Sequence, residues 1–177
     1  MSSNNNIILG IDPGLQHTGW GVISARAGQV SFVACGIIHT NAKDAVAARL
    51  LALHNGLQRV IELYKPDESA IEETFVNKNN ASSLKLGQAR GAIILSVAIT
   101  GLQCAEYSAN MVKKSVVGSG HADKAQVAMM VKTILPASNA AASGIDAADA
   151  LAVAICHAHH REINSIIGIN GIKGKIA

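Results

Sequence analysis

The order in which strands and helices follow one another limits the folds available to this chain of 177 residues. Short apolar runs bounded by turn residues predict strands, and longer runs with an apolar residue at every third or fourth position predict helices. Strands are expected at Ile7–Asp12, Thr18–Ala25, Val30–His39, Glu68–Thr74 and Leu102–Tyr107. Helices are expected at Asp44–Tyr64, Ala81–Thr100, Ala122–Leu135 and Ile145–Arg161. Three closely spaced strands followed by alternating helices and strands predict an α/β fold, in which an antiparallel meander belongs to a mixed sheet covered by helices.

The length suits a single domain. We expect this domain to span residues 7–161, between a disordered N-terminus at 1–6 and a flexible C-terminal tail at 162–177 that is rich in glycine and lysine. The segment NMVKKSVVGSGHADK, residues 110–124, is rich in Lys, Ser and Gly and is predicted to form a loop.

Composition narrows the functional classes without choosing among them. Apolar residues make up 49% of the chain, enough for a sizeable core, and the net charge of +3 neither demands nor opposes a nucleic-acid partner. Cys35, Cys104 and Cys156 are far apart and show no metal-binding spacing, so we expect reduced thiols in a cytoplasmic protein. We expect no signal peptide and no membrane association, because the N-terminus is polar and no apolar run reaches the roughly 20 residues of a membrane span.

A pair of carboxylates at the start of the last predicted helix is the first sign of chemistry. Asp146 and Asp149 lie three positions apart in SGIDAADALAVAIC, so on a helix they point the same way, with Cβ atoms roughly 5–6 Å apart. One reading is that they favour the helix dipole behind an N-cap at Ser143. However, every residue from 150 to 156 is apolar, which predicts a helix covered by protein on most sides. At the mouth of such a helix one carboxylate would take up a proton unless a cation, most simply a divalent metal ion, lies between the two.

Two further acids lie in predicted strands. Asp12 ends the first apolar strand, where its alternative role is to begin the turn at Pro13-Gly14. Strand alternation sends Glu72 and Glu73 to opposite faces, so only one of them can join a given site unless this is simply an exposed edge strand. Four carboxylates without clustered His or Cys favour Mg²⁺ or Mn²⁺ over zinc. Two Mg²⁺ ions about 4 Å apart would serve phosphodiester hydrolysis.

Five sequence blocks, in this order along the chain, resemble the RuvC family of bacterial Holliday-junction resolvases: ILGIDPGLQHTGWGVI, AIEETF, LKLGQARG, VKKSVVGSGHADKAQV and DAADALAVAICH. The resemblance implies a ribonuclease-H-like fold, whose five-stranded mixed sheet joins the three-strand meander to two parallel strands. It implies a homodimer that cuts four-way DNA junctions by paired symmetric nicks in homologous recombination and DNA repair, leaving 5′-phosphate and 3′-hydroxyl ends. The expected cofactors are two Mg²⁺ per active site, with Mn²⁺ able to substitute. The expected partners include the branch-migration proteins RuvA and RuvB.

The resemblance also assigns roles to individual residues. The metal-binding catalytic carboxylates are Asp12, Glu72, Asp146 and Asp149. Lys124 matches a catalytic lysine near the scissile phosphate, and it also opens a predicted helix, where free backbone N–H groups favour phosphate. Lys113 matches a second lysine near that phosphate.

For most of the further DNA-binding candidates, an ordinary structural or surface role is the alternative to a contact with DNA. Gly118 and Gly120 would let the backbone approach DNA closely, while Lys114 is either a phosphate contact or a solvated lysine. Lys85 and Arg90 either touch the duplex arms or are ordinary surface charges. Phe75 resembles the family's wedge at the junction crossover, and its alternative is a core aromatic. No family position assigns His17 or His121 a role.

Three competing functions remain to be tested. An actin-like ATPase also begins with a strand and Asp-x-Gly, but it needs two such domains, for which this chain is too short. A junction-binding module without catalysis would gain nothing from acids placed at the phosphates. A YqgF-type nuclease is a closer alternative, although it fits the loop VVGSGHADK less well.

Overall fold

The computed structural model describes residues 5–73, 80–138 and 144–167. The strands are β1 (Asn6–Asp12), β2 (His17–Arg26), β3 (Gln29–His39), β4 (Glu68–Glu72) and β5 (Cys104–Tyr107). The helices are α1 (Val46–Tyr64), α2 (Asn80–Ile99), α3 (Ala109–Val117), α4 (Lys124–Ile134) and α6 (Ile145–Ile167). All five predicted strands and all four predicted helices are present, and α3 is an addition to them.

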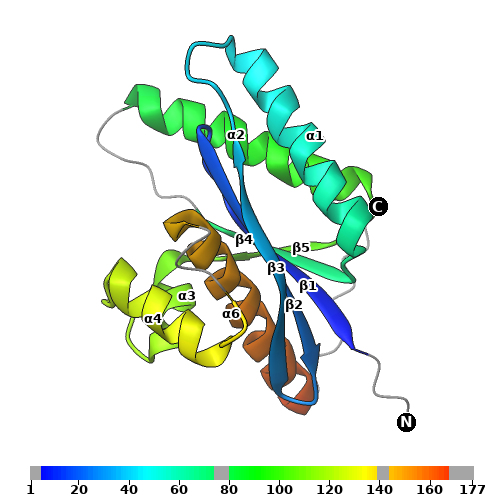
Figure 1. Cartoon of the computed structure of the whole chain (residues 1–177), viewed down its shortest axis with the longest axis vertical. Coiled ribbons are helices and arrows are strands. Elements are labelled where there is room, and N and C mark those ends of the chain that lie inside the picture. Colours follow the sequence, from blue (N-terminus) through cyan, green and yellow to red (C-terminus); the bar gives the residue numbers. More distant parts are fainter. Residues whose placement is uncertain (1–4, 74–79, 139–143, 168–177) are drawn as a thin grey trace.

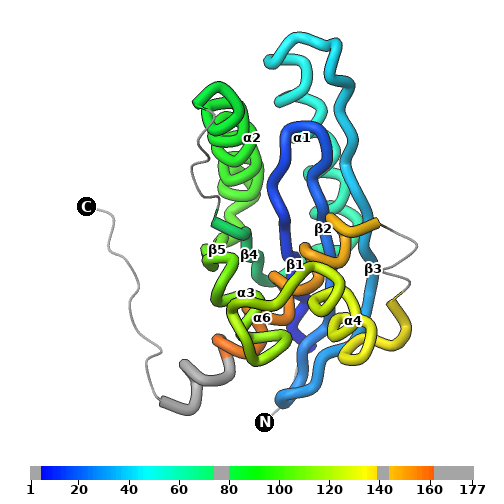
Figure 2. Tube along the Cα trace, turned by 90° about the vertical axis from the view of Figure 1, so that its left-hand side faces the viewer, coloured from blue at the N-terminus to red at the C-terminus, as the bar shows by residue number. Residues whose placement is uncertain are grey.

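The strands form one sheet in the order β3-β2-β1-β4-β5, and Figure 2 shows them side by side in this order. β1 and β3 pair antiparallel with β2, whereas β4 pairs parallel with β1 and with β5. The prediction of a three-strand meander joined to two parallel strands is therefore confirmed. The topology makes β1 the central strand, so whatever stands at its end lies in the middle of the molecule.

Helices cover both faces of the sheet and create two cores (Figure 1). Ile8 and Ile23 point to the face covered by α6, α3 and α4. Leu9 and Val22 point to the opposite face, where α1 and α2 pack. This split follows from the alternation of side chains along a strand.

The helix α6 lies on the central strands and is enclosed by protein, as its apolar sequence predicts. All side chains from Ala150 to Cys156 are buried. Glycines in the sheet allow a very close approach, since a Cβ at Gly10 would stand 2.2 Å from the carbonyl oxygen of Ala150. A Cβ at Gly19 would stand 1.9 Å from the carbonyl oxygen of Asp146. These two glycines set how near the first turns of α6 come to the end of β1.

The prediction of a loop over residues 110–124 is wrong for most of that segment, because α3 occupies its first part. The Ser108 side chain accepts a hydrogen bond from the backbone N–H of Met111 and caps the helix. Val112 and Val116, one turn apart, are buried against α6 and α4. Gly118 ends the helix in a left-handed conformation with φ of 84°. Val112 and Val116 have helical spacing, but the lysine, serine and glycine residues around them led to the prediction of a loop.

Element ends also differ from prediction. β1 includes Asn6, which was expected to be disordered, and α6 continues past Arg161 to Ile167 into the segment expected to be a flexible tail. The histidines at 157, 159 and 160 therefore lie inside α6. The proposed N-cap Ser143 lies outside the described residues. Within the described part of the chain, no helix is long and apolar enough to span a membrane.

Candidate active site

Asp12 and Glu72 lie at the ends of two neighbouring parallel strands. The register pairs Ile11 of β1 with Ile71 of β4, so the residue that follows in each strand stands beside the other. Ile11 and Ile71 both belong to the core under α1 and α2. Strand alternation therefore turns Asp12 and Glu72 to the α6 face, while Glu73 is exposed.

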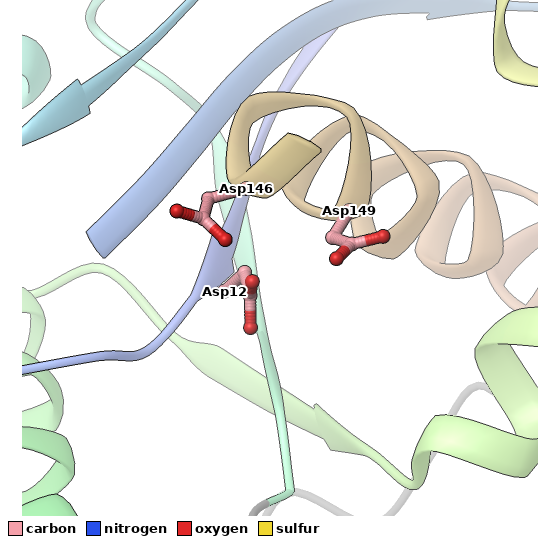
Figure 3. Close-up of side chains that lie close together, drawn as sticks. All are labelled: Asp12, Asp146 and Asp149. Carbon is pink, nitrogen blue, oxygen red and sulfur yellow. The ribbon is translucent and has the colours of Figure 1, made fainter. Parts of the chain in front are cut away.

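The first turns of α6 bring Asp146 and Asp149 to the same place. Carboxylate oxygens of Asp12, Asp146 and Asp149 all lie within 4.8 Å of one another. Figure 3 shows them gathered where the end of β1 meets the start of α6. Among the described residues this is the one group of three or more His, Cys, Asp or Glu side chains close enough to share a metal ion.

Glu72 borders this group without being part of it. It lines a cavity of about 280 Å³ together with Asp12, Asp149, Lys113 and Lys124. The rest of that cavity is apolar, formed by Ala109, Val112, Val127 and Ala152. The cavity is large enough for several waters or a phosphate group.

The crowding of acids changes their protonation. Burial, and after it the carboxylate of Glu72, raises the pKa of Asp12 to about 8. Burial and Asp149 also raise the pKa of Glu72. Both shifts mean that negative charge is unfavourable here without a compensating cation. Because the donors are all carboxylate oxygens, the group fits a hard divalent cation, as predicted.

Two lysines face the acids. The Lys124 ammonium donates a hydrogen bond to Asp149 Oδ2 at 2.8 Å, although 65% of its side chain is exposed. This bond raises the pKa of Lys124. Lys124 stands at the start of α4, whose N-cap Asp123 forms a capping box with Gln126. Lys113 of α3 lines the same cavity.

The other basic residues predicted to bind DNA do not line this cavity. Lys114 lines a separate cavity with Met111, Ser115, His159 and His160. Lys85 is exposed on α2. Arg90 is engaged in an ion pair with Glu106.

The two glycine candidates lie between α3 and α4, and only one of them has a backbone reason to be glycine. Gly118 has a structural reason to be glycine, since its φ is positive at the end of α3. A Cβ at Gly120 would make only an ordinary contact, at 3.5 Å from the Asn110 carbonyl oxygen. Phe75 lies outside the described residues.

The structure also contains a polar network that the sequence did not indicate. His157 of α6 bonds Glu68 at 2.8 Å and the Tyr107 hydroxyl at 2.9 Å. Arg161 donates to the second oxygen of Glu68 at 2.7 Å. The hydrogen bond from His157 is the main cause of the lowered pKa of Glu68. The members are up to 93 residues apart, so no local pattern could reveal that they clamp α6 to the β4–β5 edge.

Carboxylates gathered at the end of a central strand, beside lysines that can hold phosphate, define an enzyme class: nucleases that hydrolyse phosphodiesters. A family model described as crossover junction endodeoxyribonuclease RuvC matches residues 8–157. The RuvC protein of Paramagnetospirillum magneticum is 59% identical over 154 residues, covering 87% of this chain and 92% of that protein. The RuvC protein of Nitrobacter hamburgensis is 53% identical over 161 residues, covering 91% and 94%. The chain belongs to the RuvC family of crossover junction endodeoxyribonucleases.

Comparison with solved structures supports the assignment to the RuvC family. The structure described as Thermus thermophilus RuvC in complex with Holliday junction substrate superimposes with a TM-score of 0.82 at 30% identity, covering 90% of this chain and 97% of that one. A yeast mitochondrial Holliday junction resolvase, with a TM-score of 0.62 and 14% identity, shares the fold. The expected ribonuclease-H-like fold is thus confirmed, and neither the YqgF-type nor the actin-like alternative is favoured.

Proposed function

We propose that this enzyme resolves four-way DNA junctions by paired symmetric nicks, in homologous recombination and DNA repair in the cytoplasm. The observation that carries the proposal is the cluster of Asp12, Asp146 and Asp149, whose carboxylate oxygens lie within 4.8 Å of one another. The junction as substrate is supported by the Thermus thermophilus relative, which was solved with a Holliday junction.

Each side chain of the site has its own proposed role in phosphodiester hydrolysis. Asp12, Asp146 and Asp149 would hold divalent cations, with Glu72 as a further ligand from the neighbouring strand. Two Mg²⁺, which Mn²⁺ could replace, would supply a water activated for attack and neutralise the charge that develops on the leaving 3′-oxygen. Lys124 and Lys113, which line the same cavity, would hold the scissile phosphate. The products would carry 5′-phosphate and 3′-hydroxyl ends.

The DNA path proposed here runs over the end of the sheet that bears the acids. The start of α4 offers backbone N–H groups beside Lys124. Gly118 and Gly120 lie in the turn between α3 and α4, where nothing in the described chain comes within 3.4 Å of a Cβ built at either position. Lys114, Lys85 and Phe75 remain candidate contacts for the junction arms, whereas the Arg90 charge is already engaged by Glu106.

A homodimer is part of the proposal because a two-fold junction calls for two symmetric active sites. The outer face of α2 supports it. Leu84, Leu95 and Ile99 are 65%, 60% and 65% exposed, and they fall on one helical stripe with Gly87 and Gly91. A Cβ at either glycine would meet nothing within 4 Å. Cooperation with RuvA and RuvB is supported by family membership alone.

The proposal is tested by a nuclease assay with the purified chain. A synthetic four-way junction and a linear duplex of the same arm sequence are compared, each with Mg²⁺ and with chelator. We expect symmetric nicks in the junction with Mg²⁺, and little cutting of the duplex. Equal cutting of both DNAs would contradict the proposed substrate, and equal cutting with chelator would contradict the metal site.

A further inference from the structure

We propose that His17 and His39 form a second metal site, which takes a transition metal ion that prefers imidazole, such as Zn²⁺, Ni²⁺ or Cu²⁺. The site is separate from the acidic cluster in both residues and chemistry. The inference stands whether or not the chain resolves junctions.

The two imidazoles already converge. His17 begins β2 and His39 ends β3, and the two are direct partners in the strand register. Their Nδ1 atoms are 2.9 Å apart, and their rings meet edge to face with centroids separated by 5.0 Å. Both side chains are exposed, so an ion can reach the two nitrogens from solvent.

The backbone under the pair is held in place. The N–H of Thr40 donates to the Gln16 carbonyl at 3.0 Å, and the Thr40 hydroxyl donates to the Leu15 carbonyl at 2.5 Å. Arg49, whose side chain is mostly buried, in turn donates to that hydroxyl at 3.0 Å. These bonds tie the residues beside both histidines together, so little chain entropy remains to be lost when a metal ion bridges the rings.

A metal ion can replace the hydrogen bond between the two rings without changing the number of hydrogens on either ring. In the neutral pair one Nδ1 carries a hydrogen and donates it to the other. With a metal ion between them, the donor ring loses its hydrogen from Nδ1 to water and gains one on Nε2, so both rings remain neutral, carry their single hydrogen on Nε2 and offer the Nδ1 lone pair. Zinc–nitrogen bonds of about 2.0–2.1 Å at a tetrahedral angle place the two nitrogens about 3.4 Å apart, so the rings need to open only slightly.

The ligand set selects the metal. Imidazole nitrogens suit Zn²⁺, Ni²⁺ and Cu²⁺, while Mg²⁺ prefers oxygen. Apart from the acidic cluster, the described residues hold no group of three or more candidate ligands. Water would therefore complete the coordination at His17 and His39. A site with two protein ligands predicts a lower affinity than the four-ligand structural zinc sites of proteins.

Binding would have a structural effect as well. The pair stands at the open end of the β2–β3 hairpin, opposite the turn at Ala27 and Gly28. Two residues along β2, Gly19 pairs with Asp12 and supports the start of α6. A metal ion would cross-link the open end of the hairpin at the same end of the sheet as the acidic cavity. It would stabilise the folded protein by an amount that rises with the logarithm of the free metal concentration once that concentration exceeds the dissociation constant.

The test uses the full chain in excess Mg²⁺, which keeps the acidic cluster occupied. Cu²⁺ is titrated while electron paramagnetic resonance reports nitrogen coordination, and thermal melting is followed with Zn²⁺. We expect one nitrogen-coordinated Cu²⁺ per chain and a higher melting temperature with Zn²⁺. His17→Asn and His39→Asn should each weaken Cu²⁺ binding at least about tenfold and remove the Zn²⁺ effect.

Two matched variants separate this pair from histidines in general. His121→Asn removes another exposed histidine, and His160→Asn removes one that stacks on Tyr107. Both should bind Cu²⁺ like the wild type. Wild-type binding by His17→Asn and His39→Asn would overturn the proposal, as would binding that disappears only in Asp149→Asn.

Discussion

At Asp12, the chain keeps an acid in a place where its ionised form is unfavourable. Its pKa is raised to about 8 by burial and by the neighbouring acids, compared with about 3.9 for an exposed aspartate. Between these two values the folded protein holds a proton that the unfolded chain releases. The stability of the folded state therefore falls as pH rises through that window.

This gives a pH prediction. In chelator, the free energy of unfolding of the wild type should decrease from pH 5 to pH 8, and Asp12→Asn should show a smaller decrease because it has no such proton to lose. Saturating Mg²⁺ should reverse the trend for the wild type, since it favours the ionised carboxylates. Denaturant unfolding at each pH measures this. Equal pH slopes for wild type and Asp12→Asn in chelator would contradict the assignment.

Lys124 gives a second residue-scale prediction. Its ammonium occupies Asp149 Oδ2, so a divalent cation must compete with it for that oxygen. Lys124→Met should bind Mn²⁺ more tightly than the wild type in the absence of DNA, as measured by calorimetry, and yet cut junctions more slowly.

Lys113→Met is the matched control, because it removes a positive charge from the same cavity without a bond to the three-aspartate cluster. A smaller gain in Mn²⁺ affinity is expected for it. Equal gains for both variants would show that general electrostatics, and not the Lys124–Asp149 bond, controls metal binding.

At the scale of elements, the close packing of α6 on the sheet decides whether the acids meet. A Cβ at Gly19 would collide with the Asp146 carbonyl oxygen, so Gly19→Ala must push the start of α6 away from β1. Overpacking of this kind costs about 1–3 kcal/mol, or a fall in melting temperature of roughly 5 °C. Mn²⁺ affinity should fall as well.

Gly120→Ala in the turn between α3 and α4 provides the comparison, since a Cβ there makes only an ordinary contact, 3.5 Å from the Asn110 carbonyl oxygen. Replacing glycine by alanine where the backbone allows it stabilises a protein by about 0.4–1 kcal/mol, so this variant should melt at or above the wild-type temperature. If both variants melted alike, the glycine contact would not position α6.

Sequence reasoning reached the meander, the opposite faces of Glu72 and Glu73 and the burial of α6, because strand alternation and the apolar run of α6 are local patterns. The two parallel strands and the choice of Glu72 over Glu73 rested on the family resemblance. It missed α3, since the Ser108 cap and the Val112–Val116 pair were hidden in a segment of turn-forming residues. It also missed the bond between Lys124 and Asp149, which depends on how α4 packs on α6 and not on any spacing. The wedge role of Phe75 stays a prediction.

At the scale of the whole molecule, the exposed apolar stripe on α2 predicts a second copy of the chain. Leu95→Glu places a charge in that stripe and should convert the proposed dimer to a monomer, measured by light scattering after gel filtration. Met129→Glu, on the opposite side of the sheet at a residue 62% exposed, should leave the dimer intact. A dimeric Leu95→Glu would move the interface elsewhere.

The most direct test of the central claim compares Asp149→Asn with the wild type on a four-way junction in Mg²⁺, with binding and cleavage measured on the same samples. If the three aspartates form one catalytic metal site, the variant binds the junction normally and cuts it at least about a hundredfold more slowly, since metal-ion stabilisation is worth several kcal/mol. Cleavage at the wild-type rate would contradict the account.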